Sequence, residues 1–89
     1  MKMIYEIELS KESYKYLLKI DKPTRIRILD GLNILVQNPR NSELDIKKFQ
    51  GKTNLYRLRI GIYRVLYSIH GDILVINVIK IGPRGDVYK

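Results

Sequence analysis

Cysteine and tryptophan are absent from this 89-residue sequence, and histidine occurs only once. Without cysteine, neither a disulfide framework nor a thiolate metal site can form. A single histidine gives no support for a Ser-His-Asp or Cys-His catalytic arrangement. The HExxH metal spacing and the phosphate-binding loops GxxxxGK(S/T) and GxGxxG do not occur either. We therefore expect no metal ion and no cofactor.

Long apolar runs are also missing. No segment approaches the roughly 18 consecutive apolar residues of a membrane span, and residues 1–6 lack the apolar core of a secretion signal. With 45% apolar residues, 29% charged residues and only three prolines, the composition is that of a folded globular protein. We expect a single domain over residues 1–89, located in the cytoplasm and not bound to a membrane.

Acidic residues are few, and their distribution is uneven. The chain has 17 Lys and Arg against 9 Asp and Glu, a formal net charge of +8. Residues 1–45 carry 8 basic and 7 acidic residues, whereas residues 46–89 carry 9 basic and 2 acidic ones. The excess of positive charge in the second half indicates an anionic partner, such as a nucleic acid or an acidic protein.

The first half of the sequence predicts one strand and a helical hairpin. Residues 3–9 alternate between apolar and polar side chains, which is the period of a half-buried strand. The Ser10 hydroxyl can cap a first helix, and a second helix begins at Pro23 and ends at Asn38. Gly31 inside the second helix predicts close packing between the two helices.

The second half predicts a loop followed by three strands. Residues 39–54 are polar and are expected to form a loop, and the strands are expected at 56–60, 63–69 and 73–81. The last strand is almost continuously apolar, which is typical of a central strand covered on both faces. The predicted fold class is α+β with the order β-α-α-β-β-β, in which the helical hairpin packs on one face of a mostly antiparallel four-stranded sheet.

Arginines in this second half are the best candidates for a functional site. Arg57 and Arg59 are two residues apart on one predicted strand, so both side chains project from the same face. The fixed fork of guanidinium donors matches a phosphate group, so RNA binding is the direct inference. Four further basic residues can join this pair: Arg64, Arg84, Lys48 and Lys52.

Tyrosines offer rings on which RNA bases can stack. Tyr56, Tyr63 and Tyr88 are candidates for this role. Tyr63 and Tyr67, however, share one alternation face with apolar residues, and for these two a place in the core is favoured.

Two blocks of sequence, YRLRIGIYRVLY (residues 56–67) and VIKIGPRGDVY (residues 78–88), resemble the closing motifs of the RelE/ParE toxin superfamily. That family ends in a motif of the form YRxRxGxYRxxY, followed by a strand and a segment like GHRRDVY. The segment KFQG (residues 48–51), the first strand and the helical hairpin also fall where the family has them. The resemblance spans the whole chain and implies the same β-α-α-β-β-β fold.

The resemblance implies the toxin of a type II toxin–antitoxin pair. RelE-like members act as metal-independent endoribonucleases: they cleave mRNA in the ribosomal A site by attack of the 2′-hydroxyl on the adjacent phosphate. The implied partners are a RelB-like antitoxin in a hetero-oligomer, the ribosome and mRNA. Roles carried over from the matching motif positions assign Arg57 and Arg59 to the phosphate and backbone, Arg64 and Arg84 to the transition state, and Tyr88 to the base.

The group that takes the 2′-OH proton stays open. Some relatives have lysine at the positions of Arg57 and Arg59, and arginine is a poor proton acceptor. Lys48, Lys52 and Asp86 are alternatives. Pro83 and Gly85 stand where relatives often have His and Arg.

Two other functions are consistent with the same residues. The ParE branch of the superfamily shares the fold but inhibits DNA gyrase without nuclease activity. A basic RNA-binding module without activity is the third class, and its mark is a salt-dependent affinity for RNA without a cleavage product.

Overall fold

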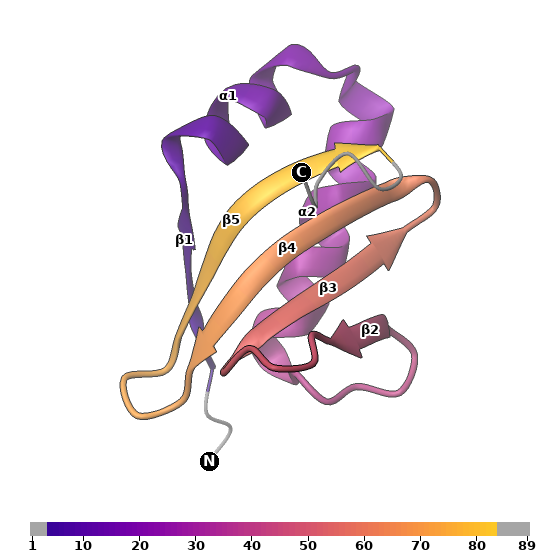
Figure 1. Cartoon of the computed structure of the whole chain (residues 1–89). Coiled ribbons are helices and arrows are strands. Elements are labelled where there is room, and N and C mark those ends of the chain that lie inside the picture. Colours follow the sequence, from indigo (N-terminus) through magenta and orange to yellow (C-terminus); the bar gives the residue numbers. More distant parts are fainter. Residues whose placement is uncertain (1–3, 84–89) are drawn as a thin grey trace.

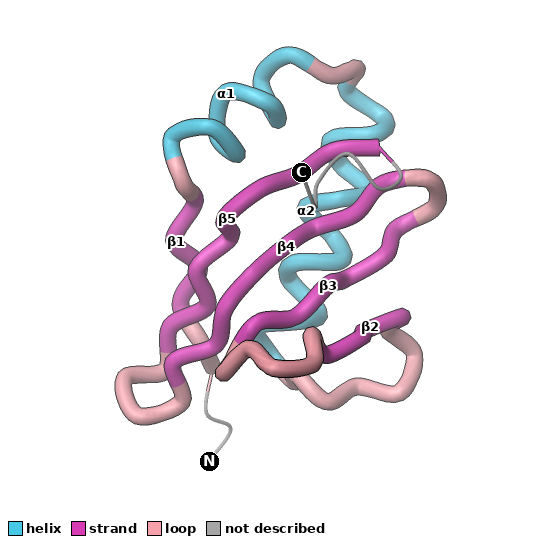
Figure 2. The backbone as a smooth tube through the Cα atoms, viewed as in Figure 1, coloured by secondary structure: helices cyan, strands magenta, loops and turns pink. Residues whose placement is uncertain are grey.

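Two helices and a five-stranded sheet make up residues 4–83, which are the residues that this computed structural model describes (Figures 1 and 2). None of the helices in this part of the chain is long and apolar enough to cross a bilayer. In chain order the elements are β1 (Glu6–Leu9), α1 (Lys11–Lys19), α2 (Lys22–Gln37), β2 (Asp45–Lys48), β3 (Leu55–Ile60), β4 (Tyr63–His70) and β5 (Val75–Pro83).

The strands lie in the order β1-β5-β4-β3-β2, with β1 parallel to β5 and every other neighbouring pair antiparallel. Both helices pack on one face of this sheet, with α2 behind the strands and α1 next to β5 in the view of Figure 1. The predicted α+β class, with a helical hairpin on one face of a mostly antiparallel sheet, is therefore confirmed. β5 is an interior strand, as its apolar sequence predicts, although β4 is the middle one.

The predicted count of four strands is wrong, because part of the segment expected to be a loop forms β2. This short strand pairs with β3 at the sheet edge, where Asp45 lies opposite Arg59 and Lys48 opposite Tyr56. Within β2 only Ile46 packs against the core. An edge strand can be polar and short because it has a partner on one side only, so its sequence carries only a weak form of the apolar alternation that marks a strand.

Serine and arginine side chains fix the ends of α1. The Ser10 hydroxyl accepts a hydrogen bond from the Ser13 backbone N–H (3.0 Å) and donates to the Ile79 carbonyl in β5 (2.7 Å). At the other end, the Arg25 guanidinium of α2 donates to the carbonyls of Leu17 (2.8 Å) and Ile20 (3.1 Å). These bonds satisfy carbonyls that have no partner inside a helix, and they join the hairpin to itself and to the sheet.

The predicted start of the second helix is confirmed with one addition, since Asp21 is its N-cap and Pro23 lies in the first turn. The Asp21 carboxylate accepts from the Thr24 N–H at 3.2 Å. Hydrogen bonding from Thr24 lowers the pKa of the Asp21 carboxyl below its usual value. Capping therefore favours the ionised carboxylate at the positive end of the helix.

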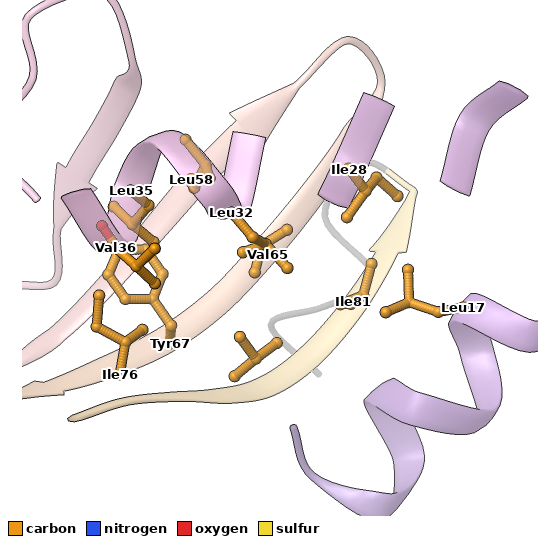
Figure 3. Packing of buried hydrophobic residues seen from close by; sticks show 11 residues of the cluster. Leu17, Ile28, Leu32, Leu35, Val36, Leu58, Val65, Tyr67, Ile76 and Ile81 are labelled. Atoms are coloured by element: carbon orange, nitrogen blue, oxygen red, sulfur yellow. The ribbon is translucent and has the colours of Figure 1, made fainter. Parts of the chain in front are cut away.

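The core lies between α2 and the sheet. Ile28, Leu32 and Leu35 of α2 are buried and point toward the strands (Figure 3). Beneath them Leu58, Val65 and Ile81 form one row across β3, β4 and β5, since Leu58 is paired with Val65 and Val65 with Ile81. This row anchors the register of the three strands.

Gly31 permits a close contact between α2 and the sheet, whereas the sequence predicts a close contact between the two helices. A Cβ atom at this position would lie 2.6 Å from Cδ1 of Ile60 and 3.9 Å from a methyl group of Leu58. The missing side chain therefore lets α2 approach β3, and the expectation of close packing between the two helices is wrong.

One extra residue in β5 keeps its apolar side chains on the helix side. β4 pairs Leu66 with Lys80 but Tyr67 with Val78, so Ile79 is a bulge. Ile76 and Val78 are buried before the bulge and Ile81 after it, whereas Ile79 is 41% exposed. Without the inserted residue Lys80 would point into the core, because a shift of one residue exchanges the two faces of a strand.

Tyr67 is the largest buried side chain of the core. Its ring stacks on Tyr56, with the ring centres 5.7 Å apart, and lies near Leu35, Val36 and Ile76 in Figure 3. Tyr63 packs at the edge of the same cluster. The prediction that Tyr63 and Tyr67 belong to the core is confirmed. Burial raises the pKa of the Tyr67 phenol far above its usual value.

The bonds of Ser10 predict a specific loss of stability. Ser10→Ala removes both the cap of α1 and the donor to Ile79, and we expect the free energy of unfolding to fall by about 1–2 kcal/mol in urea denaturation. Ser42→Ala is the matched control, since Ser42 is an exposed loop residue, and it should change stability by less than about 0.5 kcal/mol. Equal effects of the two variants would contradict the capping role.

Removal of the Tyr67 hydroxyl is predicted to raise the stability of the fold. Its oxygen is buried and has no hydrogen-bond partner among the residues described. An unpaired buried hydroxyl costs about 1–3 kcal/mol, so Tyr67→Phe should stabilise the fold by about 1 kcal/mol, as measured by urea denaturation. Tyr63→Phe, at a half-buried position, is the control that should change little. A loss of stability in Tyr67→Phe would show that the hydroxyl has a favourable contact.

Candidate functional site

The sheet face opposite the helices carries two rows of side chains, which we call the open face. Strand alternation places Arg57 and Arg59 here, because the buried Leu58 between them points toward α2. Pairing then aligns the other strands with them. The first row is Lys47, Arg57, Leu66 and Lys80, and the second row is Asp45, Arg59, Arg64 and Gly82.

Five basic residues therefore lie on adjacent positions of four strands. We call them the basic strip: Lys47, Arg57, Arg59, Arg64 and Lys80. Two of them, Arg59 and Arg64, are direct cross-strand partners. Like charges placed directly opposite each other on a sheet repel. Such an arrangement is stabilised when an anion lies between the charges, so the strip is suited to bind a polyanion.

Asp45 is the acidic residue among these two rows. Its Oδ1 lies 2.8 Å from Nη2 of Arg57, and its Oδ2 lies 3.1 Å from Nε of Arg59. One carboxylate on edge strand β2 thus bridges two guanidinium groups of β3. The two arginines keep a net positive charge after this pairing, and they keep donors that do not point at Asp45.

Arg57 and Arg59 differ in exposure. The Arg57 side chain is 16% exposed and that of Arg59 is 51% exposed. Arg57 Nε is buried without a hydrogen-bond partner in the described part of the chain. Arg64, which is half-buried, has only long contacts of 3.5 Å from its Nη1 to the carbonyls of Gly61 and Tyr63. Within residues 4–83, guanidinium donors of the strip are therefore incompletely used.

The structure brings together three of the arginines that the sequence singled out, Arg57, Arg59 and Arg64. Arg84 and Tyr88 lie outside the described residues. Lys48 is paired with Tyr56 and so belongs to the helix-facing side of β2. Lys48 and Lys52 line a hollow of the β2–β3 connection with Phe49, Gln50, Gly51 and Thr53. Lys48 therefore does not share a face with Arg57 and Arg59, and a contribution of Lys48 and Lys52 to RNA binding stays a prediction.

Tyr56 and Tyr63 also face the helices. Tyr56 stacks on Tyr67, and Tyr63 packs against the same core. Neither ring is therefore presented on the open face for a base to stack on, and that expectation is wrong. Tyr88 lies outside the described residues, so its stacking role stays a prediction.

Lys47 and Lys80 are residues of the strip that sequence reasoning missed. Lys47 shares a face with Asp45 only because residues 45–48 form a strand, and that strand was expected to be a loop. Lys80 reaches the open face only because of the bulge at Ile79. The alternation of Asp45, Ile46 and Lys47 is the one local signal that points to such a strand.

A second hollow adjoins the strip where α1 meets the end of β5. Lys80 and Gly82 line it together with Lys15, Lys19 and Tyr16 of α1. The hollow and the strip share Lys80, and Gly82 of the hollow is paired with Arg64 of the strip. Among residues 4–83, no three His, Asp or Glu side chains gather where they could hold a metal ion.

Known proteins share both the sequence and the fold. The RelE1 protein of Methanocaldococcus jannaschii is 32% identical over 88 residues, which cover 98% of this chain and 98% of that protein. A chain of the archaeal RelE–RelB complex from Pyrococcus horikoshii OT3 superposes with a TM-score of 0.81 at 34% identity, covering 94% of this chain and 99% of that chain. The isolated RelE toxin of E. coli, at 23% identity, has the same fold with a TM-score of 0.75 over 94% of this chain and 90% of that chain.

A family model described as the ParE toxin of the type II toxin–antitoxin system parDE matches residues 7–88. This range includes both rows of the open face and the two closing motifs. Together with the identity to RelE1 over nearly the whole length, it places the chain in the ParE toxin family of type II toxin–antitoxin systems, within the RelE/ParE toxin superfamily.

Proposed function

We propose that this toxin is a ribosome-dependent endoribonuclease that cleaves mRNA in the A site. The observation that carries the proposal is the basic strip, in which five cationic side chains of four strands line the face of the sheet opposite the helices. RNA is a chain of phosphates, and arginine binds phosphate through paired donors. The relatives that match over the whole chain with more than 30% identity, RelE1 and the chain of the RelE–RelB complex, support the RelE branch.

In this reaction the protein mainly has to stabilise charge in the transition state; it does not have to form a covalent bond to the RNA. The 2′-oxygen attacks the adjacent phosphorus, and the bond from phosphorus to the 5′-oxygen of the next nucleotide breaks. The products are a 2′,3′-cyclic phosphate and a 5′-hydroxyl. Negative charge grows on the phosphate oxygens in the transition state, and preorganised cations lower the barrier. In this account Arg57 and Arg59 hold the phosphate, and Arg64 and Arg84 stabilise the transition state.

Two proton transfers complete the step: the 2′-OH loses a proton, and the leaving 5′-oxygen gains one. Lys47 and Lys80 are the lysines of the open face, which makes them better placed to accept the 2′-OH proton than Lys48 on the helix-facing side. Tyr88 stacks on the base next to the scissile bond. The ribosome supplies the in-line geometry of the mRNA.

Gyrase inhibition is the second candidate function, and the match to the ParE family model favours it. Under that function the open face need not bind RNA, and loss of arginines from the strip need not abolish growth arrest. A supercoiling assay with purified gyrase distinguishes the two functions.

An antitoxin of the RelB type is the proposed partner. The neighbour from Pyrococcus horikoshii is part of a RelE–RelB complex. On the helices of this chain, Tyr14 and Leu18 lie one turn apart and are 55% and 59% exposed. An amphipathic segment can cover such a pair, and acidic residues in the same partner would be attracted by the charge of the toxin.

The direct experiment adds purified, folded protein to ribosomes paused on a defined mRNA and maps the 5′ ends by primer extension, with the same mRNA free of ribosomes as the control. We expect new ends only within the A-site codon. Intact mRNA on the ribosome would contradict the proposal and would move the test to gyrase. Binding of RNA without cleavage would indicate the inactive RNA-binding module.

Arg64 provides the sharpest test of the strip. Arg64→Ala should reduce the single-turnover cleavage rate by about 10²-fold, because a donor to the transition state is lost. Arg40→Ala is the matched control, since it removes one exposed arginine from the connection between α2 and β2. Both variants should unfold at the temperature of the parent protein. Equal cleavage rates of the two would remove Arg64 from the mechanism.

A further inference from the structure

Asp45 lies where a substrate phosphate would be expected to bind, and this position requires an explanation. Its carboxylate contacts Nη2 of Arg57 at 2.8 Å and Nε of Arg59 at 3.1 Å. The negative charge of Asp45 weakens the attraction between the basic strip and RNA. We therefore ask which favourable effect of Asp45 offsets this weaker attraction.

The geometry of the bridge shows what it contributes. Asp45 lies directly opposite Arg59, and Arg57 lies diagonally across from it on the same face. Each carboxylate oxygen forms an ion pair with one guanidinium, so the two side chains are held in one relative orientation. Arg59 makes this contact through Nε, so the bridge within residues 4–83 does not use its two terminal nitrogens. Arg57, at 16% exposure, has little freedom left.

Without the carboxylate, two changes are expected. The two guanidinium groups, which carry like charges, would repel each other, and Arg59, at 51% side-chain exposure, would sample several rotamers. A phosphate that arrives would then have to order both side chains by itself, and the donors would be misplaced for the transition state.

We propose that Asp45 is a positioning residue that orients Arg57 and Arg59 for the scissile phosphate. This inference rests on the proposed nuclease function for its kinetic consequence, but not for its structural one. Two other roles make different predictions. If Asp45 only fastens β2 to β3, its removal should lower the stability of the fold. If Asp45 only competes with RNA as an anion, its removal should make cleavage faster.

The kinetic test separates the rate constant from affinity. Asp45→Asn keeps the size of the side chain but can accept from only one of the two arginines, and we expect kcat to fall about 10-fold or more while the Kd for a short single-stranded RNA stays equal or decreases. Asp45→Glu retains a carboxylate and should recover part of kcat. Asp72→Asn, in the exposed turn between β4 and β5, removes the same charge and is the control, with kcat unchanged.

An unchanged or raised kcat in Asp45→Asn would overturn the proposal, and a raised value with tighter binding would identify Asp45 as a competing anion. The proposal would likewise be overturned if kcat fell only in parallel with the thermal unfolding temperature and recovered at lower temperature. That result would show that Asp45 only fastens β2.

The structural test does not depend on cleavage. Arg59 Nε lies 3.1 Å from Asp45 Oδ2 in an ion pair, so the Arg59 Nε–H signal should be resolved in a proton–nitrogen NMR spectrum of the parent protein, Asp45→Glu and Asp72→Asn. In Asp45→Asn the Arg59 Nε–H signal should broaden or move toward the chemical shift of solvent-exposed arginines whose protons exchange with water. The probe for the site is an RNA trinucleotide that carries 2′-O-methyl groups and cannot be cleaved.

If the parent protein cleaves no RNA, only the proposed function fails, and the NMR arm decides the inference. The Arg57 and Arg59 signals should then still respond to the trinucleotide with a single set of shifts in the parent and with broadened signals in Asp45→Asn. Identical Arg59 signals in the parent and in Asp45→Asn would overturn the positioning role.

Discussion

The alternation of the sheet is the constraint on which the rest of the molecule depends. α2 buries the row Leu58, Val65 and Ile81, and this row fixes the register of three strands. Because side chains alternate between faces, burying Leu58 also places Arg57 and Arg59 on the side opposite the helices. The stability of the core and the geometry of the basic strip therefore come from the same interaction. A register slip in β3 would lose both at once.

Local sequence signals predicted most of this architecture. The Ser10 cap and the first-turn Pro23 mark the helices, and the alternation of residues 56–60 marks β3, because each of these features is read from nearby residues alone. The features that the sequence predicted wrongly or did not predict depend on residues distant in the sequence. β2 is defined by its pairing with β3, the bulge at Ile79 by the two neighbours of β5, and the role of Gly31 by its contact with Ile60.

The candidate site divides in the same way. Arg57, Arg59 and Arg64 were found from alternation and motif, and the structure places them on one face. Lys47 and Lys80 were not found, because their direction depends on β2 and on the bulge. The bridge from Asp45 to two arginines was not found either, since Asp45 lies 12 residues from Arg57 in the sequence. Charge counts show that the second half is basic, but only the sheet arranges that charge as a strip.

The location of the RNA site is the central claim, and NMR titration tests it most directly. The uncleavable 2′-O-methyl trinucleotide is added to nitrogen-labelled protein at two salt concentrations. The account predicts shifts confined to β2, β3, β4 and the end of β5 on the open face, with an affinity that falls as salt rises. Shifts centred on α1 and α2, with no response of Arg57, Arg59 and Arg64, would contradict it.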